Sequence, residues 1–282
     1  MNNPPVSLWD HVQWLADPWL FMFEVCTYLP GTLVQLVRRR DFSTLLRPSA
    51  VRDAWFGYFW SLFGPGLRES CGPVVTPILA GRVARGAELS TSAYPPLSGR
   101  VIEVGAGSGL WASALVDAGA AHVFGVEPNP VQQAALQARI ADLGLEKKYT
   151  VVPVGIEEIG DSSRWDGRVE EESVDCIVTI LCLCSIPEPE KNVRELYKYL
   201  KKGGRWYVYE HVVTPKSAGR AMRWYQWFVN LLWPVVVGGC DIHRDTEATL
   251  RAAGDWSVFD VTEQADEPWC KMVPHIRGVL IK

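Results

Sequence analysis

The sequence predicts an α/β fold in which a largely parallel β-sheet carries helices on both faces. After residue 100, short β-rich runs alternate with helical patterns, and the runs are mostly apolar. The predicted strands lie near Val101–Val104, Val123–Val126, Thr150–Val154, Val174–Leu181, Arg205–His211, Ser257–Val261 and Ile276–Ile281. In such sheets the ligand crevice opens at the carboxyl ends of the strands, so we look for a site there.

The chain divides into a predicted helical extension, residues 1–96, and an α/β domain, residues 97–282. The boundary is placed at Tyr94–Gly99 (YPPLSG), because two adjacent prolines neither continue a helix nor join a sheet. The extension is rich in aromatic residues and carries no recognisable catalytic motif. A second aromatic block, Ala54–Leu67, ends in Gly64-Pro65-Gly66, which predicts that a helix stops or a turn forms there.

The most apolar part of the extension is Trp19–Val37, which has nearly the length of a membrane span. Glu24 and the pair Pro30-Gly31 interrupt it, and three arginines follow it. Three uses fit this segment: it covers the α/β domain or forms a homodimer contact, it attaches shallowly to a membrane, or it spans the membrane.

Composition excludes some classes of partner and site. With 48% hydrophobic and 21% charged residues and a net charge of −4, the chain has no basic surplus for nucleic acid. Its seven cysteines form no Cys-x-x-Cys pair, so we expect neither a disulfide framework nor a metal site. An intracellular location, cytoplasmic or membrane-associated, fits this cysteine usage.

A glycine-rich turn follows the first predicted strand, in Val101–Gly109 (VIEVGAGSG). Glycine allows the backbone to turn tightly and to approach a ligand closely before the helix predicted over Leu110–Ala118. The residues of this turn that we expect to contact a cofactor are Gly105, Ala106, Gly107 and Gly109.

The spacing of the glycines separates two cofactors. A dinucleotide motif, G-x-G-x-x-G, would end at position 110, which is leucine, whereas the pattern here is E-x-G-x-G-x-G from Glu103. This favours S-adenosyl-L-methionine, with S-adenosyl-L-homocysteine as product, over NAD(P). Glu103 suits the ammonium group of the methionine part, or else it is a buried structural carboxylate.

Glu127 ends the second predicted strand, where a carboxylate accepts the ribose hydroxyls of an adenosine. Pro128 and Asn129 follow it in a turn that also starts a helix, and we assign both to the cofactor site. Leu181 and Cys182, at the end of the fourth predicted strand, are expected on the same side.

These residues, with VDCIVTILCLCSI (174–186) and LKKGGRWYVYEHV (200–212), resemble the class I S-adenosylmethionine methyltransferases. More narrowly, SVDCIVTILCLCSI, Glu210-His211-Val212, Gly239–Arg244 and Pro274–Gly278 resemble the methyltransferase-like protein 7 family of alkyl thiol methyltransferases. The resemblance implies a Rossmann-like, seven-stranded sheet with a reversed hairpin at its end. It also implies adenine contacts near Gly155 and Ile156, with backbone or Glu157 supplying the hydrogen bonds.

The predicted activity is methyl transfer to the sulfur or oxygen of a small apolar or aromatic acceptor, either a thiol or a carboxylate. A thiol, with a pKa of about 8.5, must lose its proton, whereas a carboxylate, with a pKa of about 4, needs only cations to bind it. An NAD(P)-dependent oxidoreductase and a noncatalytic cofactor-binding scaffold are the alternatives.

The acceptor side is assigned to polar residues that follow the later strands. His211 is the first candidate for a base, and Asp241 and His243 are further catalytic candidates, with a capped turn as the other interpretation. Arg244 and His275 either clamp an acceptor carboxylate or pair with acidic neighbours.

Two further features have competing interpretations. Cys182 and Cys184 are two apart on a predicted strand, so we expect both thiols on one face, packed in the core. The aromatic helix Trp224–Trp233 either packs in the core or supplies an apolar acceptor wall, and Trp224 is its predicted contact.

Overall fold

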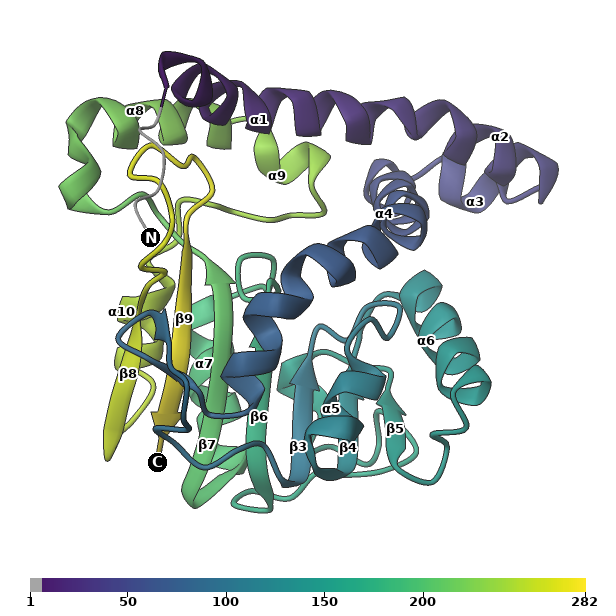
Figure 1. The fold of residues 1–282 in the computed structure, drawn as a ribbon. Coiled ribbons are helices and arrows are strands. Elements are labelled where there is room, and N and C mark those ends of the chain that lie inside the picture. The colour runs from purple at the N-terminus through teal and green to yellow at the C-terminus, as the bar shows by residue number, and fades with distance from the viewer. Residues whose placement is uncertain (1–6) are drawn as a thin grey trace.

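The computed structural model describes residues 7–282 and contains the predicted α/β sheet (Figure 1). The strand order is β5-β4-β3-β6-β7-β9-β8, and β9 alone runs in the direction opposite to the other six strands. The strands are β3 (Gly99–Val104), β4 (Ala120–Val126), β5 (Tyr149–Val152), β6 (Val174–Ile180), β7 (Leu200–His211), β8 (Val258–Glu263) and β9 (His275–Ile281). All seven predicted strands are therefore confirmed, as is the reversed hairpin.

Helices cover both faces of the sheet, as the apolar strands require. On β3, Val101 faces a cluster that includes residues of α5 (Ala112–Ala118) and α6 (Pro130–Asp142). Its neighbour Ile102 faces the opposite cluster, with residues of α7 (Pro189–Tyr199) and α10 (Thr246–Arg251). Successive strand residues point to opposite faces, so each strand contributes to two cores.

Four helices make up the N-terminal region: α1 (Leu8–Thr27), α2 (Leu29–Arg38), α3 (Phe42–Leu45) and α4 (Pro48–Leu79). The prediction that Gly64-Pro65-Gly66 ends a helix is wrong, since α4 continues through it. The ribbon of α4 changes direction along its length (Figure 1), and prolines at 65, 73 and 77 each remove one backbone donor. Packing outweighs the local preference: a Cβ on Gly64 would lie 3.1 Å from Leu110 Cδ2, so the helix sits tightly on the glycine turn.

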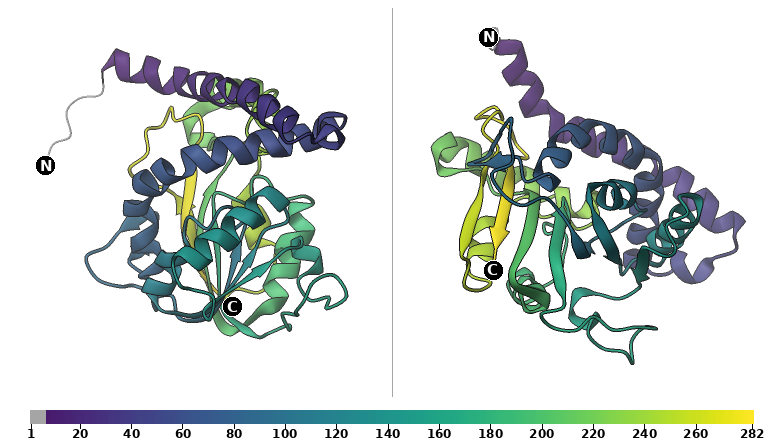
Figure 2. Two further views of the ribbon diagram at one scale, coloured as in Figure 1. Left: turned by 90° about the vertical axis from the view of Figure 1, so that its right-hand side faces the viewer. Right: turned by 60° about the horizontal axis from the view of Figure 1, so that its bottom comes forward.

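The N-terminal helices are attached to the α/β domain by hydrogen bonds as well as by apolar contact. Trp19 Nε1 donates to Tyr225 Oη at 2.6 Å, and that hydroxyl donates to the carbonyl of Leu15. Tyr225 belongs to α8 (Gly219–Asn230), beside which α1 runs in Figures 1 and 2. The predicted helix over 224–233 is divided, because α8 ends at Asn230 and α9 (Trp233–Val236) follows.

The remaining elements are short. The strands β1 (Val83–Ala84) and β2 (Ala87–Glu88) form a hairpin, η1 (Ile156–Glu158) follows β5, and η2 (Lys216–Ala218) precedes α8. The domain boundary at residues 96–97 stays a prediction. Together, α1 and α2 (Leu8–Arg38) have the length and apolar composition of a membrane span, and most of that stretch is not buried.

Candidate active site

The glycine turn between β3 and α5 has the backbone that its sequence predicts. Gly105 and Gly107 have φ angles of +65° and +55°, in the left-handed region. A Cβ on Gly105 would lie 2.6 Å from Cys182 Cβ, so only glycine allows the loop after β6 to approach. Trp60 of α4 lies beside the turn, and its Nε1 is 3.3 Å from the position that a Cβ on Gly107 would take. The turn thus lies between the loop after β6 and α4, and Gly105 itself is exposed.

Glu127, at the end of β4, holds this turn in place. One carboxylate oxygen accepts a hydrogen bond from Gly107 N and the other from Asn129 N, each at 2.8 Å. A carboxylate has about four acceptor positions, so two remain for the hydroxyls of a ribose. Asn129 caps α6 by accepting from Val131 N at 2.9 Å, and Pro128 lies exposed between them. Burial raises the pKa of Glu127.

Glu103 is a buried carboxylate beneath the turn. Its Oε2 accepts from the Tyr149 hydroxyl at 2.5 Å, and its Oε1 has no hydrogen-bond partner. Burial raises the pKa of Glu103 to about 7, with the Tyr149 hydrogen bond acting in the opposite direction. The hydrogen bond from Tyr149 fits the interpretation of Glu103 as a buried structural carboxylate. The second oxygen, Oε1, remains available to a cationic group of a ligand.

The predicted adenine side lies where β5 leads into η1. Gly155 precedes η1, and Ile156 is buried. The Glu157 carboxylate folds back over Gly155, with Oε2 2.7 Å from the position a Cβ would take. This places a carboxylate beside the backbone where the resemblance implies adenine hydrogen bonding.

The loop after β6 is organised by Glu210, a residue whose role sequence reasoning missed. Glu210 is fully buried on β7, and its carboxylate accepts from the backbone N–H of Cys182 and of Leu183, both at 3.0 Å to Oε2. Leu181, just before, has a φ of +54°, a strained value of the kind found at ligand sites. Burial raises the pKa of Glu210 to about 8. A glutamate inside an apolar strand was the available signal.

The prediction that Cys182 and Cys184 share one face is wrong. Because β6 ends at Ile180 and Leu181 is left-handed, the strand alternation does not continue to them. Cys182 packs against Gly105, whereas Cys184 Sγ lies 3.7 Å from His211 Nδ1. Both thiols are buried, as expected. His211 Nδ1 also lies 3.5 Å from Cys240 Sγ.

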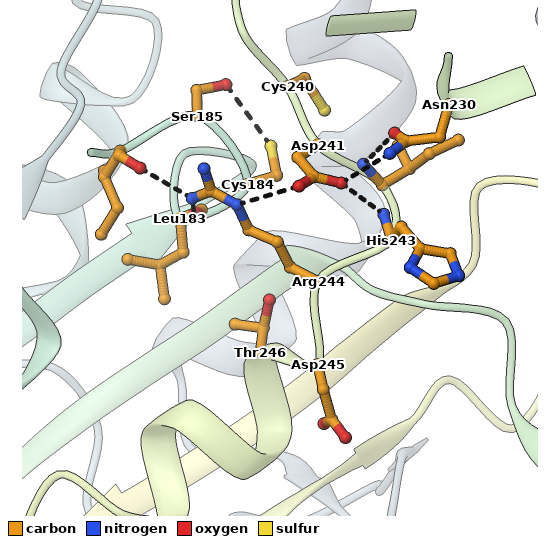
Figure 3. Close-up of polar contacts among 12 residues, drawn as sticks. Leu183, Cys184, Ser185, Asn230, Cys240, Asp241, His243, Arg244, Asp245 and Thr246 are labelled. Atoms are coloured by element: carbon orange, nitrogen blue, oxygen red, sulfur yellow. Dashed lines mark hydrogen bonds and ion pairs between the residues drawn. The ribbon is translucent and has the colours of Figure 1, made fainter. Parts of the chain in front are cut away.

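The segment 241–244 forms the predicted turn and orders its neighbours (Figure 3). Asp241 Oδ1 accepts from Asn230 Nδ2 and from the backbone N–H of His243, both at 2.9 Å. The guanidinium of Arg244 donates to the carbonyls of Leu183 and Ile186, both at 2.8 Å. The exposed ring of His243 points away from Cys184 in Figure 3. These contacts match the capped-turn interpretation.

Two predicted acceptor residues are not free to bind an acceptor: His275 lies beside His211 but is engaged by Glu267, and Trp224 lies outside the site. His275 pairs with His211 across β7 and β9, but its Nδ1 bonds to Glu267 Oε1 at 2.6 Å. Burial lowers the pKa of His275 to about 4, so the ring is neutral at neutral pH and is a partner of Glu267. The Trp224 side chain is 63% exposed and stacks on Phe228, so the structure does not bring it into this site.

The comparisons with known proteins agree with this geometry. A family model described as "Methyltransferase domain" matches residues 80–249, more than half of the chain. The chain belongs to this methyltransferase family. S-adenosylmethionine is therefore its cofactor, as the glycine spacing predicted, and the NAD(P) alternative is excluded. The glycine turn, the unpaired Oε1 of Glu103 and the remaining acceptor positions of Glu127 fit that molecule.

The curated relatives include thiol S-methyltransferases. The chain is 28% identical to human thiol S-methyltransferase TMT1A over 64% of this chain and 70% of that protein. It is 28% identical to human TMT1B, over 66% of this chain and 72% of that protein. It is 27% identical to rat TMT1B, over 56% of this chain and 61% of that protein. The chain thus spans less than two thirds of the rat protein's length. The predicted resemblance to this group is confirmed.

Solved structures show the same fold. The [4+2]-cyclase SpnF has a TM-score of 0.54 at 18% identity, covering 80% of this chain and 95% of that one. A putative O-methyltransferase from Nostoc punctiforme has a TM-score of 0.51 at 13% identity, covering 82% and 60%. The fold is shared with a cyclase, so the fold alone does not define the reaction.

Replacing Glu127 by Gln tests the predicted ribose contact. The amide keeps one acceptor oxygen and loses the charge, so we expect S-adenosylhomocysteine to bind about 10- to 100-fold more weakly, since charged hydrogen bonds contribute about 1.5–3 kcal/mol. Isothermal titration calorimetry measures this. Glu146→Gln, on an exposed side chain after α6, is the control and should bind as the wild type does. Unchanged affinity in Glu127→Gln would remove Glu127 from the cofactor site.

Proposed function

We propose that this chain transfers a methyl group from S-adenosylmethionine to the sulfur of a small, apolar thiol. The observation that carries the proposal is the position of His211. Its ring lies at the carboxyl end of β7, beside Cys184 of the loop that follows β6. Cys182 of the same loop packs on the glycine turn. An imidazole there favours the ionised form of an acceptor that must lose a proton.

The contacts of the two candidate cations support a thiol over a carboxylate. A carboxylate acceptor is already anionic and needs a free cation to bind it. Arg244 is engaged by two backbone carbonyls, and its Nε lies 3.8 Å from Asp241 Oδ2. His275 is bonded to Glu267 and is neutral at neutral pH. The names of the relatives, thiol S-methyltransferases, point the same way.

Several residues have separate tasks in this proposal. When bound, S-adenosylmethionine supplies a methyl group made electrophilic by its sulfonium. Glu127 and the glycine turn hold the adenosine part, and Glu210 fixes the loop between cofactor and acceptor. Trp60 of α4 lies beside Gly107 and forms one side of the cofactor site. Positioning and desolvation of the two reactants account for most of the rate enhancement that such a transfer requires.

A pocket between α1 and the segment before β9 suits an apolar acceptor. Its volume is about 280 Å³, close to the lower end for small-molecule sites. It is lined by Trp14, Asp17, Pro18, Phe21, Trp233, Pro268, Lys271, Met272 and Val273. Several of these residues belong to the same packed cluster as Cys184 and Cys240. The N-terminal helix α1 therefore contributes to the wall of the proposed acceptor pocket.

The outer side of the same helices supports shallow membrane attachment. Large apolar side chains are exposed on α1 and on the neighbouring segments α8 and α9, which lie side by side in Figures 1 and 2. They include Leu8, Trp9, Leu20, Phe23, Trp224, Trp227, Leu231, Leu232 and Val235. Exposed aromatic and aliphatic side chains on neighbouring helices are typical of an interfacial surface. A lipophilic thiol dissolved in a membrane would then reach the pocket directly.

The thiol proposal is tested with purified protein, S-adenosylmethionine and a panel of alkyl thiols, phenols and carboxylic acids. We expect methyl thioethers as products, detected by mass spectrometry, and a rate that rises with pH as the thiol ionises. His211→Gln should lower turnover by about 100-fold or more, the range for a proton-transfer group. His122→Gln, on β4 and bonded to Thr150, should not.

Products confined to carboxylic acids would contradict the thiol proposal. Cofactor binding without turnover on any acceptor would instead identify a noncatalytic scaffold.

Membrane attachment is tested by sedimentation with lipid vesicles. The double variant Trp224→Ser/Trp227→Ser removes exposed indoles, so it should bind vesicles several-fold more weakly than the wild type. Leu89→Ser, at an exposed position on the hairpin side, is the matched control. An interfacial role for α8 would be refuted if all three proteins sediment equally with the vesicles, or if none of them sediments.

A further inference from the structure

Three side chains with soft donor atoms converge at the acceptor side of the site. Cys184 follows β6, His211 ends β7 and Cys240 follows α9, so the sequence separates them by dozens of residues. Their two Sγ atoms and a ring nitrogen lie within 4.8 Å of one another. Figure 3 shows the thiols of Cys184 and Cys240 close together above Arg244. The sequence, which has no Cys-x-x-Cys pair, gave no sign of this cluster.

The distances in this cluster match a tetrahedral metal ion. With metal–sulfur bonds of about 2.3 Å and metal–nitrogen bonds of about 2.0 Å, a tetrahedral angle places sulfur and nitrogen about 3.5 Å apart. His211 Nδ1 lies 3.7 Å from Cys184 Sγ and 3.5 Å from Cys240 Sγ. Both sulfur–nitrogen separations therefore fit edges of a tetrahedral site, and the two Sγ atoms lie within 4.8 Å of each other.

The backbone holds these three residues together without relying on the thiols. Asp241 N donates to the carbonyl of Cys184 at 2.8 Å, which joins the segments that carry the two cysteines. Cys240 N donates to the carbonyl of Val237 at 2.9 Å. Glu210, next to His211, fixes the loop at Leu183 N. A set of ligands that is already positioned loses less conformational freedom when it binds an ion.

The chemistry of the ligands selects the ion. Two thiolates and an imidazole suit Zn²⁺ and other soft or borderline ions, and do not suit Mg²⁺ or Ca²⁺. Within residues 7–282, no fourth acidic, histidine or cysteine ligand joins the group. The neighbouring Asp241 carboxylate is directed to Asn230 and lies 3.8 Å from Arg244. Three protein ligands with a fourth position open is the arrangement of catalytic zinc sites.

We propose that Cys184, His211 and Cys240 bind Zn²⁺, and that the open fourth position binds the acceptor thiol as a thiolate. The binding of the acceptor thiolate to the ion rests on the proposed function. On metal binding, the two cysteine thiols release their protons to solvent, and sulfur lone pairs and Nδ1 form the bonds to zinc. The acceptor thiol then loses its proton to solvent, and its sulfur replaces water on the ion. With zinc bound, His211 promotes ionisation of the acceptor as a ligand of the ion, in place of a direct role as base, and no oxidant or reductant is needed.

The experiment uses the full chain, reduced, stripped of metal and reloaded with Zn²⁺ or Co²⁺. We expect one zinc per chain by mass spectrometry of the metal, and thiolate-to-cobalt charge-transfer absorption with Co²⁺. Cys184→Ser, Cys240→Ser and His211→Gln should each bind Zn²⁺ at least about 10-fold more weakly. Cys270→Ser, a buried cysteine of the same apolar cluster, is the control and should bind as the wild type does. Thermal unfolding with and without zinc shows that each variant folds.

An alkyl thiol added to the cobalt protein without S-adenosylmethionine should shift the charge-transfer band. The metal site is refuted if the reduced wild type binds no zinc, if Cys270→Ser loses as much affinity as Cys184→Ser, or if the cysteines form only a Cys184–Cys240 disulfide. Zinc binding with no response to thiol refutes the open position. Methylated thiols from a metal-free protein would refute this inference and leave the proposed function standing. If the protein binds zinc and the thiol but forms no methylated product, the metal site stands and the proposed function is refuted.

Discussion

The site depends on one buried contact, between the Glu210 carboxylate and the backbone of the loop after β6. The carboxylate accepts from two successive N–H groups, Cys182 and Leu183. Buried polar groups are costly unless they are paired, so this contact specifies a single loop conformation. The loop can then carry Cys182 against the glycine turn and Cys184 beside His211. A single carboxylate thus sets the position of the cofactor side relative to the acceptor side.

The N-terminal helices have two roles that follow from their two faces. Inward, α4 packs on the glycine turn through Trp60 and Gly64, and α1 contributes Phe21 to the apolar pocket. Outward, α1 and α8 expose large apolar side chains such as Trp9 and Trp227. An extension that is merely a cover would not need that outer surface. In the proposed function, the same helices join the acceptor pocket to a surface that would meet lipid.

Local sequence signals predicted the sheet, the glycine turn and Glu127, because strand alternation and turn geometry depend on neighbouring residues. They failed where distant contacts decide. The helix α4 passes through Gly64-Pro65-Gly66 because tertiary packing outweighs local preference. Cys184 and Cys240 meet only through the fold, so their spacing carried no signal. Arg244 was recognisable as a polar candidate, but its binding to backbone carbonyls required the structure.

We expect the carboxyl ends of β3, β4, β6 and β7 to bring the methyl donor and the group around His211 to one place. A crystal structure of the zinc-loaded protein with S-adenosylhomocysteine measures this directly. The account predicts the ribose on Glu127, the adenine beside Gly155, and the sulfur of the product facing the side of Cys184, His211 and Cys240. A product sulfur that faces α5, with that cluster closed off from it, would contradict the account.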